Sequence, residues 1–391
     1  MLRVQRDQIL GFRLASHHLS ARLPAGSLAA AAAACGIQDT PLNTAPLAFW
    51  ARVDALGPAE VGHALAADKS LLALWSVRGA PHVIPLGDAG VFTTGALPVD
   101  QPSFGVFLGG WAGSLEAAGL SATELLAEMA TAALAALDRQ PLAIDALRNQ
   151  LAQRVPALAR LSRPSGAHAD LPEPLIRALG LLGLVCIAAQ PGTDPRLART
   201  DATITRVDRW LGKPPADGDR PQARAELARR FLHCYGPSSP RAFAEWTARG
   251  LADARDAFGL LDQELVEVDA AGTRAWVLAD DTDALVDPPP ADGIRLLPPQ
   301  DPYLQQRDRT TLLPDKTQHK RVWRPVRPPG VVLAAGQLVA TWRSRQAGKR
   351  LEVTVEPLGG LPAATRAAIQ AEADQIAPFR NCQAAQVTID T

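Results

Sequence analysis

Three consecutive polar side chains, Gln38, Asp39 and Thr40, stand between two apolar stretches of helical character. A positioned carboxylate such as Asp39 can act as a general base, and an amide such as Gln38 can orient the water that the base activates. The same residues also suit a helix junction, because Thr40 followed by Pro41 is a favourable N-cap with proline at the first helical position. In that case Asp39 accepts backbone N–H bonds in the opening turn. Both interpretations stay open, and one residue can fulfil both.

The elements that must position such side chains are clearest in residues 235–278. The serine–serine–proline run at 238–240 predicts a helix start, and the apolar residues after it share one helical face. Gly250 breaks that helix, a second helix is expected in 251–262, and residues 264–278 alternate like two strands around an Ala-Gly turn. A helix, a tight turn, a second helix and a hairpin indicate a winged helix.

Two weaker copies of this order of elements precede it, at about 47–86 and 142–211, and a Pro- and Asp-rich linker at 280–293 leads into strand-like runs and a closing helix. We therefore predict a mainly α fold with β (α+β), built from three tandem winged-helix units and a C-terminal α+β region. The expected boundaries are 1–120 for the first unit, 121–220 for the second, 221–290 for the third, and 291–391 for the C-terminal region with its basic segment.

Composition indicates an ordinary globular chain, since 47% of its 391 residues are hydrophobic and the formal net charge is zero. No apolar run reaches the roughly 18 residues that a membrane-spanning helix needs, and the start lacks the apolar core of a signal peptide. The four cysteines are scattered, without metal-ligand spacing to each other or to a histidine, so neither a zinc site nor a disulfide framework is indicated. We expect buried thiols, no metal and no cofactor.

Charge is sorted along the chain, because residues 251–292 hold eleven acids against two arginines, whereas 307–350 hold eleven Lys or Arg against two acids. This distribution is expected of a protein with a basic surface that binds a polyanion. It is also expected if the acidic and basic blocks merely compensate each other between neighbouring domains. Within the basic block, prolines and Trp323 predict an extended, exposed segment that follows a DNA backbone and wedges a ring. The candidates for DNA contact there are Lys316, Lys320, Arg321, Arg324 and Arg327.

Other candidates have an alternative structural role. Arg78 and His82 flank a turn, where they could contact phosphate or a flipped nucleotide, or simply belong to a wing. Tyr303, Arg307 and Arg309 combine an aromatic ring with arginines and suit stacking and phosphate binding. The neighbouring Asp301 suits an internal Asp–Arg bridge better than DNA contact. Trp246 and Trp342 are expected in the core, and of the adjacent His17 and His18 we expect one buried and one exposed.

Four blocks in order, "LWSVRGAPHVIPL", "YGPSSPRAFAEWT", "LLPPQDPYLQQRDR" and "LAAGQLVATWR", resemble the AlkZ/YcaQ-type winged-helix DNA glycosylases, over about Asp7 to Leu358. The resemblance implies three winged-helix units around duplex DNA and removal of bulky or cross-linked N-alkylated purines. It also implies a reactive motif of Gln, an apolar residue, then Gln or Asp. Gln38 matches the first position, whereas Asp39 stands at the apolar position and Thr40 at the third, so the carboxylate is shifted by one residue.

From these features we expect a monofunctional DNA glycosylase with Gln38 and Asp39 as catalytic residues and Thr40 among the DNA contacts. The alternative is a DNA-binding regulator or lesion sensor that has lost the reactive residue. The expected partner is double-stranded DNA, with no membrane association, and the expected state is a monomer in the cytoplasm, associated with the nucleoid.

Overall fold

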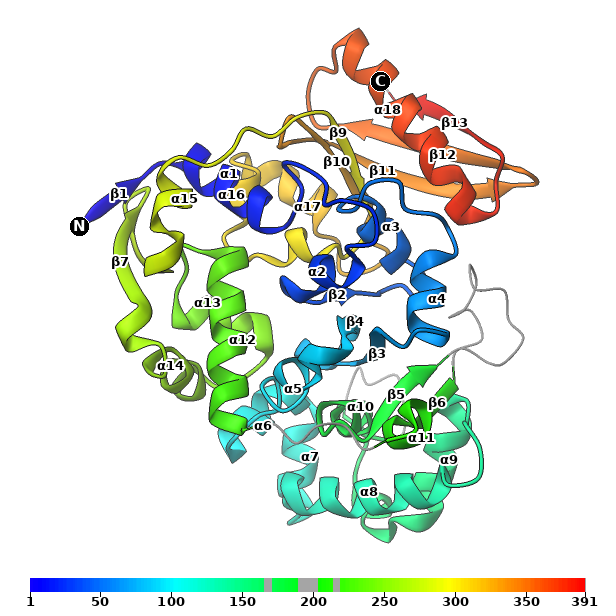
Figure 1. Ribbon diagram of the computed structural model, residues 1–391. Coiled ribbons are helices and arrows are strands. Elements are labelled where there is room, and N and C mark those ends of the chain that lie inside the picture. The colour runs from blue at the N-terminus through cyan, green and yellow to red at the C-terminus, as the bar shows by residue number, and fades with distance from the viewer. Residues whose placement is uncertain (165–170, 189–202, 214–218, 391) are drawn as a thin grey trace. The chain divides into compact units, whose positions relative to one another are not determined.

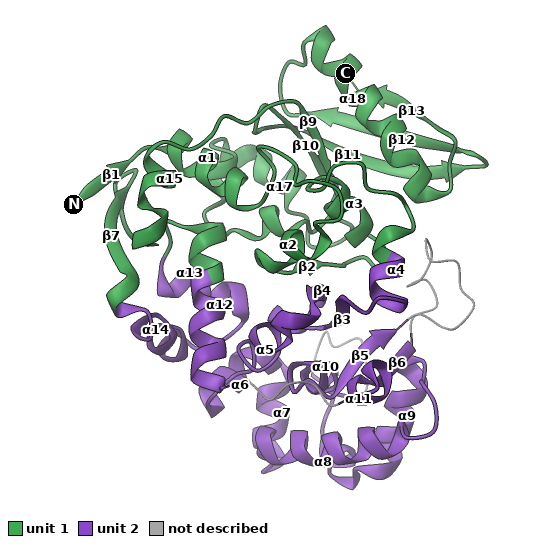
Figure 2. Cartoon of the chain, in the orientation of Figure 1, with its two compact units in different colours: residues 1–61, 230–238, 263–391 green, residues 62–229, 239–262 purple. Residues whose placement is uncertain are grey.

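The computed structural model describes residues 1–164, 171–188, 203–213 and 219–390 (Figure 1). The chain divides into two compact units that are discontinuous in sequence (Figure 2). Unit 1 comprises 1–61, 230–238 and 263–391, and unit 2 comprises 62–229 and 239–262. The four sequence ranges predicted as domains stay a prediction.

Unit 1 holds a five-stranded sheet in the order β13-β12-β11-β10-β9, with α18 lying against it (Figure 1). Strands β9 to β12 pair antiparallel and β13 joins β12 in parallel. Helix α18 buries Ile369, Ala373 and Ile376. The strands are β9 Ile294–Leu297, β10 Gly330–Ala334, β11 Gln337–Ala347, β12 Arg350–Pro357 and β13 Ala384–Ile389, and α18 is Ala363–Ile376.

A second sheet of unit 1 runs β1-β7-β8, in which β1 pairs parallel with β7 and the hairpin β7–β8 closes over the turn at Ala271 and Gly272. Its buried face packs on α1 through Val4, Phe12 and Val268. The hairpin was predicted and is confirmed. These elements are β1 Leu2–Val4, α1 Arg6–Ser16, β7 Leu265–Ala270 and β8 Thr273–Leu278.

Shorter elements complete unit 1 and pack on a core that includes Leu10, Leu297 and Tyr303. They are α2 Leu28–Ala33, β2 Ile37–Gln38, α3 Ala45–Trp50, α15 Thr282–Val286, α16 Arg309–Leu312 and α17 His319–Val322. Two helices cross the boundary between the units, α4 Glu60–Ala66 and α12 Arg220–Tyr235.

Unit 2 is mainly helical, with α8 packed on α9 and α10, and α10 packed on β3. Gly180 permits the last of these contacts, because a Cβ there would lie 2.9 Å from the carbonyl oxygen of Trp75 in β3. Strands β3 and β4 form one antiparallel hairpin and β5 and β6 another. The strands are β3 Leu71–Trp75, β4 Pro81–Pro85, β5 Val185–Ala188 and β6 Thr203–Arg206.

Helix α13 of unit 2 begins as predicted, since the hydroxyl of Ser239 accepts the N–H of Ala242 at 3.3 Å and Pro240 is the first helical residue. Its buried face contains Phe243 and Trp246, and α14 begins just after Gly250, so both helix predictions are confirmed. The helices of unit 2 are α5 Ala89–Phe92, α6 Gln101–Leu108, α7 Trp111–Ala117, α8 Ala122–Ala136, α9 Ile144–Arg154, α10 Glu173–Leu181, α11 Val207–Leu211, α13 Pro240–Thr247 and α14 Leu251–Gly259.

Among the described residues, the order of a helix, a second helix and a hairpin recurs three times, as α3-α4-β3-β4, α9-α10-β5-β6 and α13-α14-β7-β8. In the second copy Leu142 forms a bridge with Ile204 of β6, and in the third Ser238 forms one with Trp276 of β8. Residues 189–202, between the strands of the second hairpin, lie outside the described residues. The α+β class is confirmed, and among the described residues no helix is long and apolar enough to cross a bilayer.

Candidate active site and nucleic-acid interface

The polar trio lies at the junction of β2 and α3, and its carboxylate is fixed by backbone donors. Asp39 is 0% exposed, and its Oδ1 accepts the N–H groups of Thr44 and Ala45, both at 2.9 Å. The expected N–H acceptance is confirmed, but the expected helix start is wrong. Thr44, not Thr40, is the N-cap residue, because the chain makes a turn after Pro41 before α3 begins at Ala45.

The two neighbours of Asp39 are also enclosed. Gln38 is 6% exposed at the end of β2. Thr40 is partly buried, and its hydroxyl Oγ1 is inaccessible to solvent and makes no hydrogen bond to any residue that the structure describes. Buried hydroxyls without a protein partner are uncommon and mark places where water or a ligand completes the bonding. The trio therefore combines a fixed carboxylate with a hydroxyl that can take a further partner.

Helix α3 is held at its other end by a buried ion pair. Arg52 donates to both carboxylate oxygens of Asp301, at 2.7 and 2.8 Å, and to the carbonyl of Ala48 at 2.8 Å. The two charged side chains are 1% and 0% exposed. Asp301 also accepts the N–H of Tyr303 at 2.9 Å. The internal Asp–Arg bridge expected for Asp301 is confirmed, and it fixes the helix that follows the motif.

One cation near Asp39, Arg380, was not among the predicted site residues, and it interacts electrostatically with the Asp39 carboxylate. Burial lowers the pKa of Arg380, and the negative charge of Asp39 acts in the opposite direction. Arg380 lies in a short 3-10 helix after α18 and belongs to no recognisable motif. Its proximity is a product of tertiary packing within unit 1.

Arg78 and His82 of unit 2 occupy the β3–β4 hairpin. Arg78 has a φ of 59° and donates to the carbonyl of Trp246 at 2.7 Å. His82 is 4% exposed, its Nδ1 lies 2.9 Å from the carbonyl oxygen of Ala80, and burial lowers its pKa to about 4. Arg78 thus has a structural partner, and His82 is a neutral core residue at neutral pH, which does not favour a phosphate contact.

The aromatic and arginine candidates near Asp301 are less accessible than expected. Tyr303 is 1% exposed and packs against His17 with ring centroids 5.4 Å apart, so its ring is not presented for base stacking. Arg307 is partly buried. The guanidinium of Arg309 lies over the ring of Trp323, 5.1 Å from its centroid.

The basic segment is folded at its start, which corrects the expectation of an extended chain. Residues 316–318 form a 3-10 helix that continues into α17. The indole N–H of Trp323 donates a hydrogen bond to the carbonyl of Leu304 at 3.1 Å, which holds this ring in place. Arg321 also has a structural role, because it donates to the carbonyl of Pro357 at 2.8 Å. The exposed cations of this segment are Lys316, Lys320, Arg324 and Arg327.

The described residues of unit 1 thus contain the motif trio, the buried Arg52–Asp301 pair and the exposed cations, whereas Arg78 and His82 belong to unit 2. The expectations for the tryptophans are confirmed, since Trp246 and Trp342 are 2% and 3% exposed. His17 is buried, as expected for one of the two histidines, but His18 is partly buried where an exposed residue was expected. The neighbours of His17, Cys35 and Cys234, were not predicted.

Comparisons with known proteins agree in one family. A family model described as "DNA glycosylase AlkZ-like" matches residues 31–379. The "Interstrand DNA cross-link repair glycosylase" of Streptomyces sahachiroi is 25% identical over 342 residues, which is 86% of each chain. The solved structure of the "Streptomyces sahachiroi DNA glycosylase AlkZ" matches with a TM-score of 0.75 at 22% identity and full coverage of both chains, so the fold is shared.

Proposed function

The chain belongs to the AlkZ-like DNA glycosylase family, and from this premise we propose that it hydrolyses the N-glycosidic bond of alkylated or cross-linked purines in duplex DNA. The observation that carries the proposal is the bonding at the motif. Asp39 is fixed by two backbone N–H groups, and beside it the buried hydroxyl of Thr40 has no partner among the described residues. A water molecule or a nucleotide oxygen would supply that partner.

Hydrolysis of the N-glycosidic bond of an alkylated purine requires few catalytic groups besides a carboxylate and a positioned water molecule. An N-alkylated purine already carries positive charge, so it departs as a neutral base and leaves an oxocarbenium-like sugar. A carboxylate facing that charge stabilises it electrostatically and can deprotonate the attacking water. We assign Asp39 as this carboxylate, and Gln38 and Thr40 as the groups that orient the water. The reaction is monofunctional in this proposal, without a covalent lysine intermediate.

We propose that the three recurring helix–helix–hairpin segments are winged-helix units. Their support is the order of the elements together with the bridges from Leu142 and Ser238 to the second strand of the hairpin that follows. In each case a single residue that precedes the two helices, or stands just before the first, pairs with the outer strand of the hairpin, which ties the start of the segment to its hairpin.

We propose that DNA is bound through the cations Lys316, Lys320, Arg324 and Arg327, because each is exposed and none forms an ion pair with another residue that the structure describes. Contacts of this kind neutralise phosphates and release counterions, so binding will weaken steeply with salt. The protein is expected to act as a monomer and, since its substrate is chromosomal, to associate with the nucleoid in the cytoplasm.

The alternative function, a DNA-binding protein without base release, is favoured by one observation, the complete burial of Asp39 beneath its own helix start. Single-turnover incubation with a duplex that carries N7-alkylguanine separates the two functions. Alkali-labile sites that form with the wild type and form more slowly with Thr40→Val support the glycosylase, because valine keeps the shape and removes only the hydroxyl. Salt-sensitive binding with no base release supports the alternative.

A further inference from the structure

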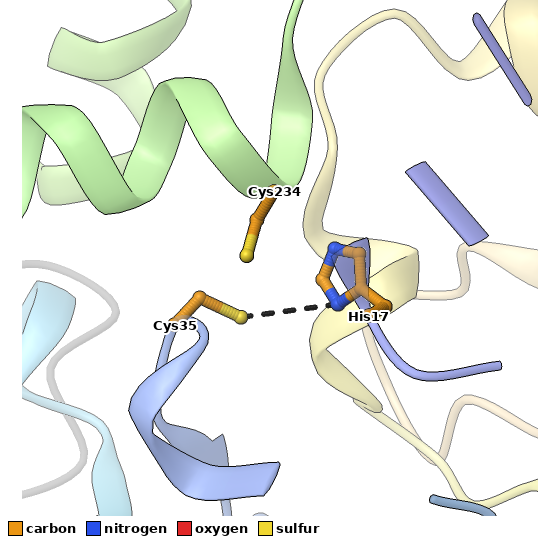
Figure 3. A group of neighbouring side chains, drawn as sticks. All are labelled: His17, Cys35 and Cys234. Carbon is orange, nitrogen blue, oxygen red and sulfur yellow. Dashed lines mark hydrogen bonds between the residues drawn. The ribbon is translucent and has the colours of Figure 1, made fainter. Parts of the chain in front are cut away.

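We propose that His17, Cys35 and Cys234 bind a thiophilic metal ion, Zn²⁺ or Cu⁺, at a site separate from the glycosylase motif. The three side chains point toward one another from three different segments of unit 1 (Figure 3). His17 follows α1, Cys35 stands between α2 and β2, and Cys234 is in the last turn of α12. One potential ligand atom from each lies within 4.8 Å of the others.

The spacing is close to that of a formed metal site. Zn²⁺ binds sulfur at about 2.3 Å and imidazole nitrogen at about 2.0 Å, so two tetrahedral ligands are separated by about 3.5 to 3.8 Å. Nδ1 of His17 lies 3.9 Å from Sγ of Cys35, and no pair in the group exceeds 4.8 Å. Side-chain adjustments of less than about 1 Å would bring all three ligand atoms within bonding distance of one shared ion.

The cluster is sealed from solvent and holds an unsatisfied polar atom. His17, Cys35 and Cys234 are 1%, 3% and 0% exposed. Nε2 of His17 is buried and makes no hydrogen bond to any residue in the described part of the chain. An ion bound at Nδ1, the nitrogen nearest to Sγ of Cys35, would place the proton on Nε2, so the ion itself would not satisfy Nε2. The case for the site therefore rests on the three enclosed donor atoms that converge.

The ligand types select the class of ion. Two thiolates and an imidazole are soft to borderline donors, which favour Zn²⁺ and Cu⁺ over Mg²⁺ or Ca²⁺. The hydroxyl of Tyr235 donates to the carbonyl of Pro302 at 2.9 Å and lies 3.6 Å from Sγ of Cys35, so it is a hydrogen-bonding neighbour of that sulfur. Cu⁺ can be bound by the three ligands alone, whereas four-coordinate Zn²⁺ would take a water molecule as its fourth ligand. Two thiolates also balance the charge of Zn²⁺, so a neutral centre would be buried.

A metal ion here would join α1, the segment before β2 and α12. Cys35 stands three residues before Gln38, so the ion would restrain the segment that carries the proposed catalytic motif. Its role is structural, because the ligands are not shared with the motif.

The test uses the full chain purified without chelators and measures zinc and copper per chain by elemental mass spectrometry. We expect one ion per chain in the wild type and its loss in Cys35→Ser and in Cys234→Ala. Cys186→Ser, which alters a buried thiol of β5 outside the cluster, is the matched control and is expected to retain the ion.

A second measurement covers variants that fold poorly. The wild type is first freed of metal with a chelator, which is then removed, and is titrated with Zn²⁺, or with Cu⁺ under reducing conditions. We expect its Tm to rise as metal is added. In a separate titration with Co²⁺ we expect a thiolate-to-metal absorption band to appear. The proposal is overturned if the wild type holds no metal and neither cation raises its Tm. Intact mass then distinguishes a Cys35–Cys234 disulfide, which lowers the mass by two hydrogens, from two free core thiols.

Discussion

The buried pair of Arg52 and Asp301 gives the sharpest stability prediction. Asp301→Asn keeps the side-chain shape and the oxygen that accepts the N–H of Tyr303, but it leaves a charged guanidinium that is 1% exposed without its counterion. Breaking a buried pair by removing one partner costs about 3–5 kcal/mol, because the remaining charge is left uncompensated in the core. We therefore expect Asp301→Asn to lower the free energy of unfolding by about 3 kcal/mol or more.

Urea denaturation followed by circular dichroism measures this loss. The matched control is Arg345→Met, which breaks a pair with Glu352 in which the arginine side chain is 80% exposed, and it should cost less than about 1 kcal/mol. The double variant Arg52→Met with Asp301→Asn should be less destabilised than the sum of its single variants, since neither charge is then left alone. A loss for Asp301→Asn no larger than that of the control would refute the account of this pair.

Three further predictions address DNA binding, pH and packing. Lys320→Ala and Arg324→Ala should each weaken duplex binding and reduce the slope of log K against log salt by about one, and unchanged slopes in a fluorescence-anisotropy titration would remove these residues from the DNA surface. Burial lowers the pKa of His82 from 6.5 to about 4, so the unfolded chain binds a proton that the folded protein excludes and stability falls as the pH drops through this window. The free energy of unfolding falls by up to about 3 kcal/mol over this pH range. In His82→Gln, Tm should therefore decrease less between pH 6.5 and pH 4 than it does in the wild type. In Gly180→Ala the new methyl group would lie 2.9 Å from a backbone oxygen of β3, at a cost of about 1–3 kcal/mol in urea denaturation, whereas Gly113→Ala in α7 meets no atom within 4 Å and should be neutral or stabilising.

Elements specified by local signals were predicted correctly from the sequence. Helix α13 has its cap and proline at the expected residues, and the β7–β8 hairpin turns at the Ala-Gly pair, because both depend on residues within a few positions of each other. Strands β1 and β13 were not predicted. Each is paired in parallel with a strand distant in sequence or reached through a helix, and the short run itself carries no decisive pattern.

At the candidate site, too, features set by neighbouring residues were predicted better than features set by tertiary packing. The N–H bonds to Asp39 were expected, but the helix start was misassigned to Thr40 and Pro41, since a Thr-Pro pair suits a turn as well as a cap. Exposure of Tyr303 and His82 could not be read from their positions in loop-like motifs, because burial depends on segments that pack over them. For the same reason Cys35 and Cys234, separated by most of unit 2 in sequence, gave no signal of their proximity to His17.

The most direct test of the central claim is the single-turnover rate of base release by Asp39→Asn. Asparagine retains an oxygen that can accept the N–H groups of Thr44 and Ala45, so the start of α3 is preserved while the carboxylate charge is lost. The account predicts a rate at least about 10²-fold below that of the wild type, with DNA affinity and unfolding free energy close to those of the wild type. Base release by Asp39→Asn at the wild-type rate would contradict it, and would leave Asp39 as a helix cap alone.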